Sequence, residues 1–397
     1  MRAIWLLIGC LALPLEAQST AVFEAPRRYQ KPDAPRLDMS PQAAVFVRFG
    51  REIYSAAHSD AVMLGKAIDT FLAAPNNDTL ASARDAWRAA RPAYGRSETL
   101  RFINSPIDHP GDATVPPGPE LRINAWPVNE AVIDAVKGDP TSGLISSDIA
   151  LDAQTLIRSN QASDEADITL GWHAIEFLLW GQDFSSSGPG DRAASDFVPG
   201  SAINERRRQY LKLATEVLIA DLASVAAAWR DESTLQYGQW LEKQPAVEVV
   251  GRALHGAASL AAIELYGERM TVALDSRSQE DEHSCFSDNT LADLASNLEG
   301  IRELIAGTRN GEPTGDSVMA LVRWKDPALA NRLSTALDAA RDSLATLDEP
   351  FDQIILASDD APIRARAEAT ASHMRDIAVA LKASAEALGI DIVVPGV

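Results

Sequence analysis

One stretch of the chain places a histidine and a carboxylate three residues apart on a predicted helix. Residues 171–183 read GWHAIEFLLWGQD, and neither Gly nor Pro interrupts the run from Trp172 to Trp180. Apolar side chains at positions i, i+3 and i+7 form a stripe that faces a core, while His173 and Glu176 share a neighbouring face. An imidazole and a carboxylate at this spacing can offer two metal ligands from one helix.

This pair alone does not define a metal site. Two ligands cannot hold zinc or iron tightly, so further ligands must come from elsewhere in the chain or from water. A helix-surface pair, or a buried histidine that is satisfied by its own glutamate, explains the same spacing without any metal. Other catalytic signatures are absent: the chain contains no H-E-x-x-H, no G-x-S-x-G and no Cys-His signature.

The elements that must position this pair are predicted to be helices. Helical periodicity runs from Pro41 almost to the end, with long amphipathic stretches at 44–72 and 204–229. Five prolines within 106–119 make the stretch between Pro92 and Pro127 irregular. Further helices are expected at 78–90, 130–136, 147–160, 167–180 and 290–305. The polar stretch 280–284 is expected to be a largely solvated connection.

Composition and charge restrict the function classes. The chain is 46% hydrophobic and 23% charged, as in ordinary globular proteins. Its net charge of −20 disfavours nucleic acid and anionic membrane surfaces as partners, whereas cations can gather near such a chain. Cys10 and Cys285 are the two cysteines, so removal of a leader that contains Cys10 leaves no internal disulfide.

The chain is predicted to consist of a leader and two helical domains. Residues 1–17 have the features of a secretory signal peptide, with a lipid anchor at Cys10 as the alternative, and 18–39 is expected to be a flexible lead-in. Residues 40–235 and 236–397 are the two expected domains, with a linker within 231–245. A faint repeat supports this division, because GR is followed by AA at the same spacing after Gly50 and after Gly251.

Four motifs resemble those of the imelysin family. They are WRAARPAYGRSE (87–98), RINAWPVNEAVID (122–134), GWHAIEFLLWGQD (171–183) and EHSCFSDNT (282–290). Along the chain they come in the same order as in the family. The family contains bacterial periplasmic or lipid-anchored proteins described as insulin-cleaving metallopeptidases, together with iron-regulated proteins. The resemblance implies an all-α fold of two related up-and-down helical bundles, with the polar motifs lining a shared cleft.

Chemistry and the resemblance together give a set of candidate site residues. Beside His173 and Glu176 it contains Glu98, Arg101, Asp108, Trp126, Glu130, Arg192, Asp288 and Asn289. Helix capping is the alternative role for Asp288 and Asn289.

Three functions remain open at this point. The first is a periplasmic protein that binds iron, zinc or an iron-containing small molecule and works with a membrane-associated uptake partner. The second is a metallopeptidase, which needs a metal-bound water and a general base. The third is a helical scaffold without catalysis.

Overall fold

The computed structural model describes residues 29–33, 37–108, 117–185, 188–309, 312–313 and 316–397. Within them the regular structure is helical apart from one hairpin of two-residue strands, β1 (Thr308–Arg309) and β2 (Glu312–Pro313). The all-α prediction is therefore confirmed. The expected signal peptide 1–17, the candidate anchor Cys10 and lead-in residues 18–28 and 34–36 lie outside the described residues.

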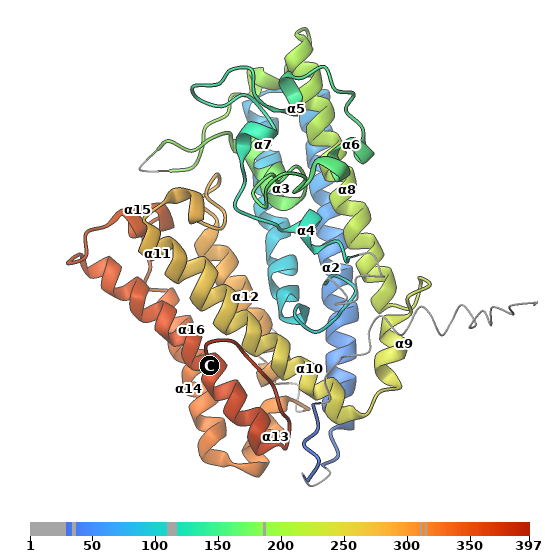
Figure 1. Ribbon diagram of the computed structural model, residues 1–397, viewed down its shortest axis with the longest axis vertical. Coiled ribbons are helices and arrows are strands. Elements are labelled where there is room, and N and C mark those ends of the chain that lie inside the picture. Colours follow the sequence, from blue (N-terminus) through green and yellow to red (C-terminus); the bar gives the residue numbers. More distant parts are fainter. Residues whose placement is uncertain (1–28, 34–36, 109–116, 186–187, 310–311, 314–315) are drawn as a thin grey trace, which may run out of the picture.

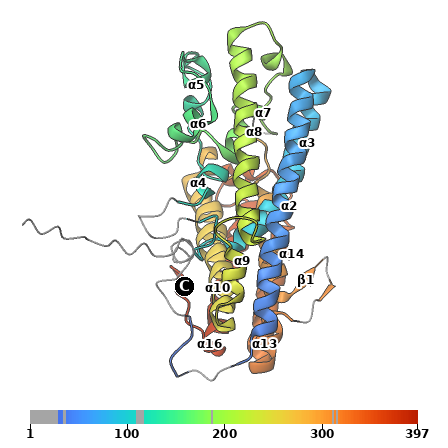
Figure 2. The ribbon, with the colours of Figure 1, turned by 90° about the vertical axis from the view of Figure 1, so that its right-hand side faces the viewer.

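Three long helices form one side of the molecule. α2 (Ser40–Ala73) packs against both α3 (Asn77–Ser97) and α8 (Ala202–Trp229), and the three run side by side in Figures 1 and 2. α3 starts at a capping box, in which the Asn76 side chain accepts the Thr79 backbone N–H and the Thr79 hydroxyl accepts the Asn76 backbone N–H. These helices follow the apolar periodicity of the sequence.

Shorter elements connect α3 to α8 and cover the upper part of the long helices (Figure 1). They are η2 (Glu98–Leu100), α4 (Glu120–Ile123), η3 (Glu130–Val132), α5 (Gly143–Ser146), α6 (Ala153–Ser159), α7 (Gly171–Trp180) and η4 (Ala194–Phe197). The predicted helices at 130–136 and 147–160 are therefore shorter than expected. Every residue of α7 is buried.

The second half of the chain forms another helical layer. Its elements are α9 (Tyr237–Glu242), α10 (Ala246–Ser259), η5 (Leu260–Val272), α11 (Ala273–Ser276), η6 (Gln279–Asp281), α12 (Thr290–Ala306), α13 (Val318–Lys325), α14 (Pro327–Leu344), α15 (Phe351–Leu356) and α16 (Pro362–Ala387). α16 packs against α14, α10 and η5. α9 lies inside the stretch that was expected to be a linker.

Contacts between the two halves are extensive. α12 packs against α3, α10 packs against α2, and the buried apolar residues form one cluster through both halves. Tyr29 of the lead-in is buried, and its hydroxyl group forms a hydrogen bond of 2.8 Å with Nδ1 of His255. The division at 235/236 and the internal duplication remain predictions.

Among the residues that the structure describes, one helix is long and apolar enough to cross a membrane. It spans Ala246–Ser276, and 72% of its most apolar window is buried inside the protein, as in the core helix of a soluble fold. Its middle part, η5, has π-helical geometry, which places residues five positions apart on one face. Glu264 and Arg269 are such a pair, and Arg269 Nε donates to Glu264 Oε2 at 3.2 Å.

Candidate functional site

His173 and Glu176 bind each other inside α7. His173 Nδ1 and Glu176 Oε2 lie 2.8 Å apart, and the two side chains are 2% and 0% exposed. The start of the helix is fixed by close packing, because a Cβ on Gly171 would lie 2.5 Å from the carbonyl oxygen of Ile123, and φ is +88°. The pair is therefore a rigid hydrogen-bonded unit, and its two side chains do not diverge towards solvent.

The second oxygen of Glu176 is also occupied. The backbone N–H and the hydroxyl of Ser287 donate to Oε1 at 2.9 and 2.7 Å. Burial raises the pKa of Glu176 to about 8, although the hydrogen bonds from Ser287 act in the opposite direction. At neutral pH the carboxyl group therefore holds a proton, which it shares with His173.

A second histidine reaches the same place from the other half of the chain. The rings of His173 and His283 meet edge to face with their centroids 4.7 Å apart, and Trp126 contacts His283 at 5.0 Å. Burial lowers the pKa of both histidines well below the usual value, and nearby arginines lower it further. Both imidazoles are therefore neutral at physiological pH.

The expectation of a solvated connection at 280–284 is wrong for its second half. Glu282 and His283 are each 2% exposed, and Ser284 is fully buried. Burial raises the pKa of Glu282 well above its usual value, which favours the protonated form of this carboxyl group. The polar composition of the segment concealed this burial, and its match to the EHSCFSDNT motif was the only sequence signal that could have revealed it.

Arg91 connects His283 to the rest of the site. Its Nη2 lies 3.3 Å from His283 Nε2, its Nη1 donates to Asn124 at 2.7 Å, and its Nε donates to Asp293 at 3.0 Å. Asp293 also accepts the Ser284 hydroxyl at 2.5 Å and the Asn289 amide at 3.2 Å. Asn289 therefore supports a buried ion pair from a position next to the site. Arg91 and Asp293 were missed, because an arginine on an amphipathic helix is ordinarily solvated.

Glu98 and Arg101 belong to a buried ion network beside this site. Arg269 donates to Glu98 Oε2 at 2.5 Å, and Asn297 donates to Glu98 Oε1 at 3.1 Å. Arg101 lies 3.3 Å from Glu120 and 3.4 Å from Glu264. Burial acts to raise the pKa of Glu98, but the charge and hydrogen bonds of Arg269 lower it more, so that this pKa lies below its usual value. Both oxygens of Glu98 are occupied, which makes it a structural carboxylate and not a free ligand.

Among the remaining candidates, Trp126 contacts His283, and Asp288 follows Ser287 in the chain and is influenced by the charge of Glu176. Asp108 accepts the backbone N–H groups of Phe102, Ile103 and Ser105 and so organises the turn after η2. Glu130 is in η3, and Arg192 donates to Asp134 at 2.8 Å. Asp288 adopts a φ of +55°, and burial raises its pKa to about 7.

The donor set around His173 is incomplete as a closed metal site. No group of three or more His, Cys, Asp or Glu side chains in the described ranges is placed to hold a metal ion. Two imidazole nitrogens nevertheless have no hydrogen-bond partner among those residues, namely His173 Nε2 and His283 Nδ1. Buried imidazole nitrogens without partners are rare, because a buried polar group without a hydrogen bond costs about 1–3 kcal/mol.

Comparison with known proteins gives consistent matches over most of the chain. The imelysin family model matches residues 50–381. Iron-regulated protein A of Synechococcus elongatus is 22% identical over 307 residues, which are 75% of this chain and 73% of that protein.

Two solved structures have the same fold. A candidate iron-regulated protein A precursor from Parabacteroides distasonis superposes with a TM-score of 0.68 and 18% identity, over 91% of this chain and 98% of the other. An imelysin-like protein from Psychrobacter arcticum has a TM-score of 0.60 and 16% identity, over 91% of this chain and 99% of the other.

Proposed function

The chain belongs to the imelysin family, and we propose that it is an iron-associated protein that binds a transition metal, iron or zinc, at His173. The proposal depends on one observation. His173 Nδ1 is held by Glu176, while Nε2 is buried and has no partner among the described residues. An imidazole that is fixed at one nitrogen and free at the other is prepared to bind a metal ion.

Glu176 acts on the metal through His173 in this proposal. Both oxygens of Glu176 are engaged, Oε2 by His173 and Oε1 by Ser287. Once Glu176 has lost its proton it accepts Nδ1–H, which selects the tautomer with a free Nε2 lone pair and makes the imidazole more basic. Glu176 is thus a positioning residue for the ligand His173.

His283 is the second protein ligand in this proposal. Its Nε2 accepts from Arg91, so binding of a metal at Nδ1 requires the ring proton to move to Nε2 and the contact with Arg91 to open. Two imidazoles that share one ion have ring centres roughly 4.5–5.5 Å apart, because a metal–nitrogen bond is about 2.1 Å long. The observed distance between the centroids of His173 and His283 is 4.7 Å. Imidazole donors suit iron, zinc and copper. The positions that two histidines leave open would be filled by water or by the donor atoms of an iron-containing small molecule.

The name of the family suggests peptidase chemistry. The geometry supports metal binding better. A metallopeptidase needs a free carboxylate or a comparable base close to a metal-bound water. Both oxygens of Glu176 are engaged by His173 and Ser287, so this group is not placed to take a proton from a metal-bound water. A scaffold without a ligand would explain the buried ion pairs but not the two unpartnered imidazole nitrogens.

The sequence and one relative support a location and a partner for this proposal. Residues 1–17 support export to the periplasm. The similarity to a protein named for its regulation by iron supports iron as the relevant metal. We infer that the protein delivers iron to, or receives iron from, a membrane-associated uptake partner.

Elemental analysis of the purified protein tests the proposal. We expect the native chain to bind about one equivalent of iron or zinc, with His173→Ala retaining little. His373→Ala is the matched control, because His373 lies on the surface of α16, 37% exposed, beside Asp376. Equal metal content in all three proteins would show that the His173–Glu176 pair is structural. Peptide hydrolysis by the native protein that chelators abolish would establish the peptidase.

A further inference from the structure

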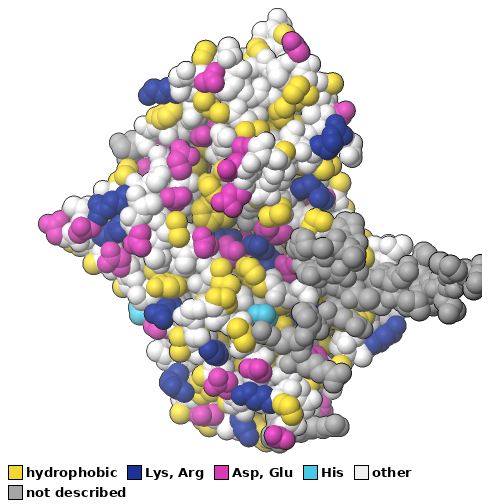
Figure 3. All heavy atoms as spheres, viewed as in Figure 1, with side chains coloured by type: hydrophobic (Ala, Val, Ile, Leu, Met, Phe, Trp, Pro, Cys, Tyr) yellow, Lys and Arg dark blue, Asp and Glu magenta, His cyan; other side chains and the backbone are white. Residues whose placement is uncertain are grey.

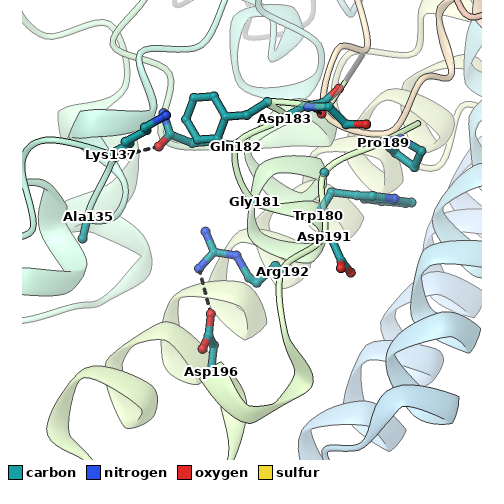
Figure 4. A pocket seen from close by; sticks show the side chains of 13 residues that line it. Ala135, Lys137, Trp180, Gly181, Gln182, Asp183, Pro189, Asp191, Arg192 and Asp196 are labelled. Carbon is teal, nitrogen blue, oxygen red and sulfur yellow. Dashed lines mark hydrogen bonds and ion pairs between the residues drawn. The ribbon is translucent and has the colours of Figure 1, made fainter. Parts of the chain in front are cut away.

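A pocket lies at the C-terminal end of α7, seven residues beyond His173. Its volume is about 510 Å³, and its lining includes Lys137, Trp180 and Arg192. Figure 4 shows the Arg192 guanidinium in the middle of the side chains that line the pocket. We propose that this pocket binds the carboxylate group of a small organic molecule, with Arg192 as its anchor. The proposal is independent of metal binding at His173.

Arg192 is a buried cation that is only partly neutralised. Its side chain is 8% exposed, and its Nη1 donates to Asp134 Oδ2 at 2.8 Å. The same carboxylate is already bound at both oxygens by Arg207, at 2.7 and 3.1 Å. One carboxylate therefore serves two buried guanidinium groups. Burial lowers the pKa of Arg192, as does the neighbouring charge of Arg207.

The other carboxylate near Arg192 compensates little. Asp196 Oδ2 lies 3.9 Å from Arg192 Nη1, and the Asp196 side chain is 43% exposed (Figure 4). A long ion pair with an exposed partner contributes little stabilisation. The positive charge of Arg192 therefore favours a further anion in the pocket.

One edge of the Arg192 guanidinium lacks a hydrogen-bond partner among the described residues. Nε is buried without a hydrogen-bond partner in the described part of the chain, and Nη2 has no acceptor there either. Nε and Nη2 together form a planar fork that matches the two oxygens of a carboxylate. Nε lies directly behind the pocket lining at Gly181, since a Cβ on this residue would lie 3.5 Å from Nε.

The rest of the pocket suits a small carbon skeleton with one negative charge. The Lys137 ammonium lies 4.6 Å from the centre of the exposed Phe184 ring and supplies a second cation. Trp180 and Phe184 provide apolar surface. Three aspartates also line the pocket, Asp183, Asp191 and Asp196. They oppose a dianionic phosphate more strongly than a carboxylate with a single charge.

Binding of benzoate and benzamide to the full chain tests this proposal by calorimetry and thermal unfolding. The two probes have nearly the same shape, and only benzoate carries the charge. We expect benzoate to bind and to raise the melting temperature, inorganic phosphate to bind more weakly, and benzamide not to bind. Equal binding of benzoate and benzamide, tighter binding of phosphate, or no binding of benzoate would overturn the proposal.

Variants test the role of Arg192. Arg192→Lys keeps the charge but removes the planar fork, and we expect benzoate affinity to fall roughly 10- to 100-fold, the loss of charged hydrogen bonds. Lys137→Gln changes an exposed side chain and should weaken binding without affecting the fold. Arg341→Gln, at an exposed residue outside the pocket lining, should leave benzoate affinity unchanged. Native affinity in both Arg192→Lys and Lys137→Gln would disprove the assignment.

Discussion

The Nδ1 atom of His173 and the Oε2 atom of Glu176 are 2.8 Å apart on a helix in which every residue is buried. One proton must lie between them. Its position decides whether His173 Nε2 carries a hydrogen or a free lone pair, because a neutral imidazole holds a single N–H. The protonation state of Glu176 therefore governs both the stability of the apo protein and its readiness to bind a metal.

The first prediction concerns stability and pH. The pKa of Glu176 is about 8 in the folded chain, against 4.5 as its ordinary value. Because the folded value is the higher one, the stabilisation that the protonated group confers is complete below about pH 4.5 and is lost as pH rises towards 8. Glu176→Gln carries no charge, so its free energy of unfolding should rise relative to native between pH 5 and 8. Urea unfolding measures this difference; parallel pH profiles for the two proteins would contradict it.

The second prediction concerns metal binding and pH. Below about pH 8 both Glu176 and His173 hold a proton, and one of the two must leave before His173 Nε2 can bind a metal. Zinc binding should therefore release about one proton and strengthen about tenfold per pH unit up to pH 8. Calorimetry in buffers with different ionisation enthalpies counts that proton.

Glu176→Gln provides the control for this pH dependence. Its amide oxygen can accept Nδ1–H at any pH, so zinc binding should lose most of its pH dependence between 6.5 and 8. An identical pH slope in the native and Glu176→Gln proteins would show that the proton comes from another group.

The third prediction concerns the ion pair below the site. Arg91 and Asp293 are each 1% exposed and 3.0 Å apart. Asp293→Asn leaves the Arg91 charge buried without a counterion, and removal of one partner of a buried pair costs about 3–5 kcal/mol. Denaturant unfolding should show this loss, whereas Asp342→Asn, which breaks an exposed pair with Arg341, should have little effect. A stability close to native in Asp293→Asn would mean that Arg91 finds another acceptor.

The long helices could be predicted from the sequence, because apolar residues recur along α2, α3 and α8 at the helical period. The π-helical geometry of η5 could not, since a shift in hydrogen-bond register leaves no pattern in residue type. The net charge of −20 predicted an acidic surface. Figure 3 shows acidic side chains scattered over the face that it draws.

Spacing alone predicted the candidate site only where its residues are neighbours in the sequence, whereas Trp126 and Asn289 were included through the resemblance to the family. His173 and Glu176 share a helix, so their spacing revealed the contact. Ser287 binds Glu176 from 111 positions away, and His283 lies in a segment whose polarity suggests solvent. Such contacts depend on how the two halves of the chain pack, which no local pattern records. Arg192 was grouped with His173 by the resemblance, but it faces a different pocket.

The last prediction tests whether His283 is a ligand in its own right. The ring of His283 contacts those of His173 and Trp126, and its Nδ1 has no partner among the described residues. Cu²⁺ is a suitable probe, because it binds imidazole more tightly than other divalent first-row metals. Pulsed electron paramagnetic resonance should detect two imidazole nitrogens on Cu²⁺ in the native protein and one in His283→Ala. Trp126→Phe preserves the aromatic contact and should still show two. One imidazole in both the native protein and His283→Ala would mean that His283 only packs against the true ligand, and that the remaining donors come from outside the chain.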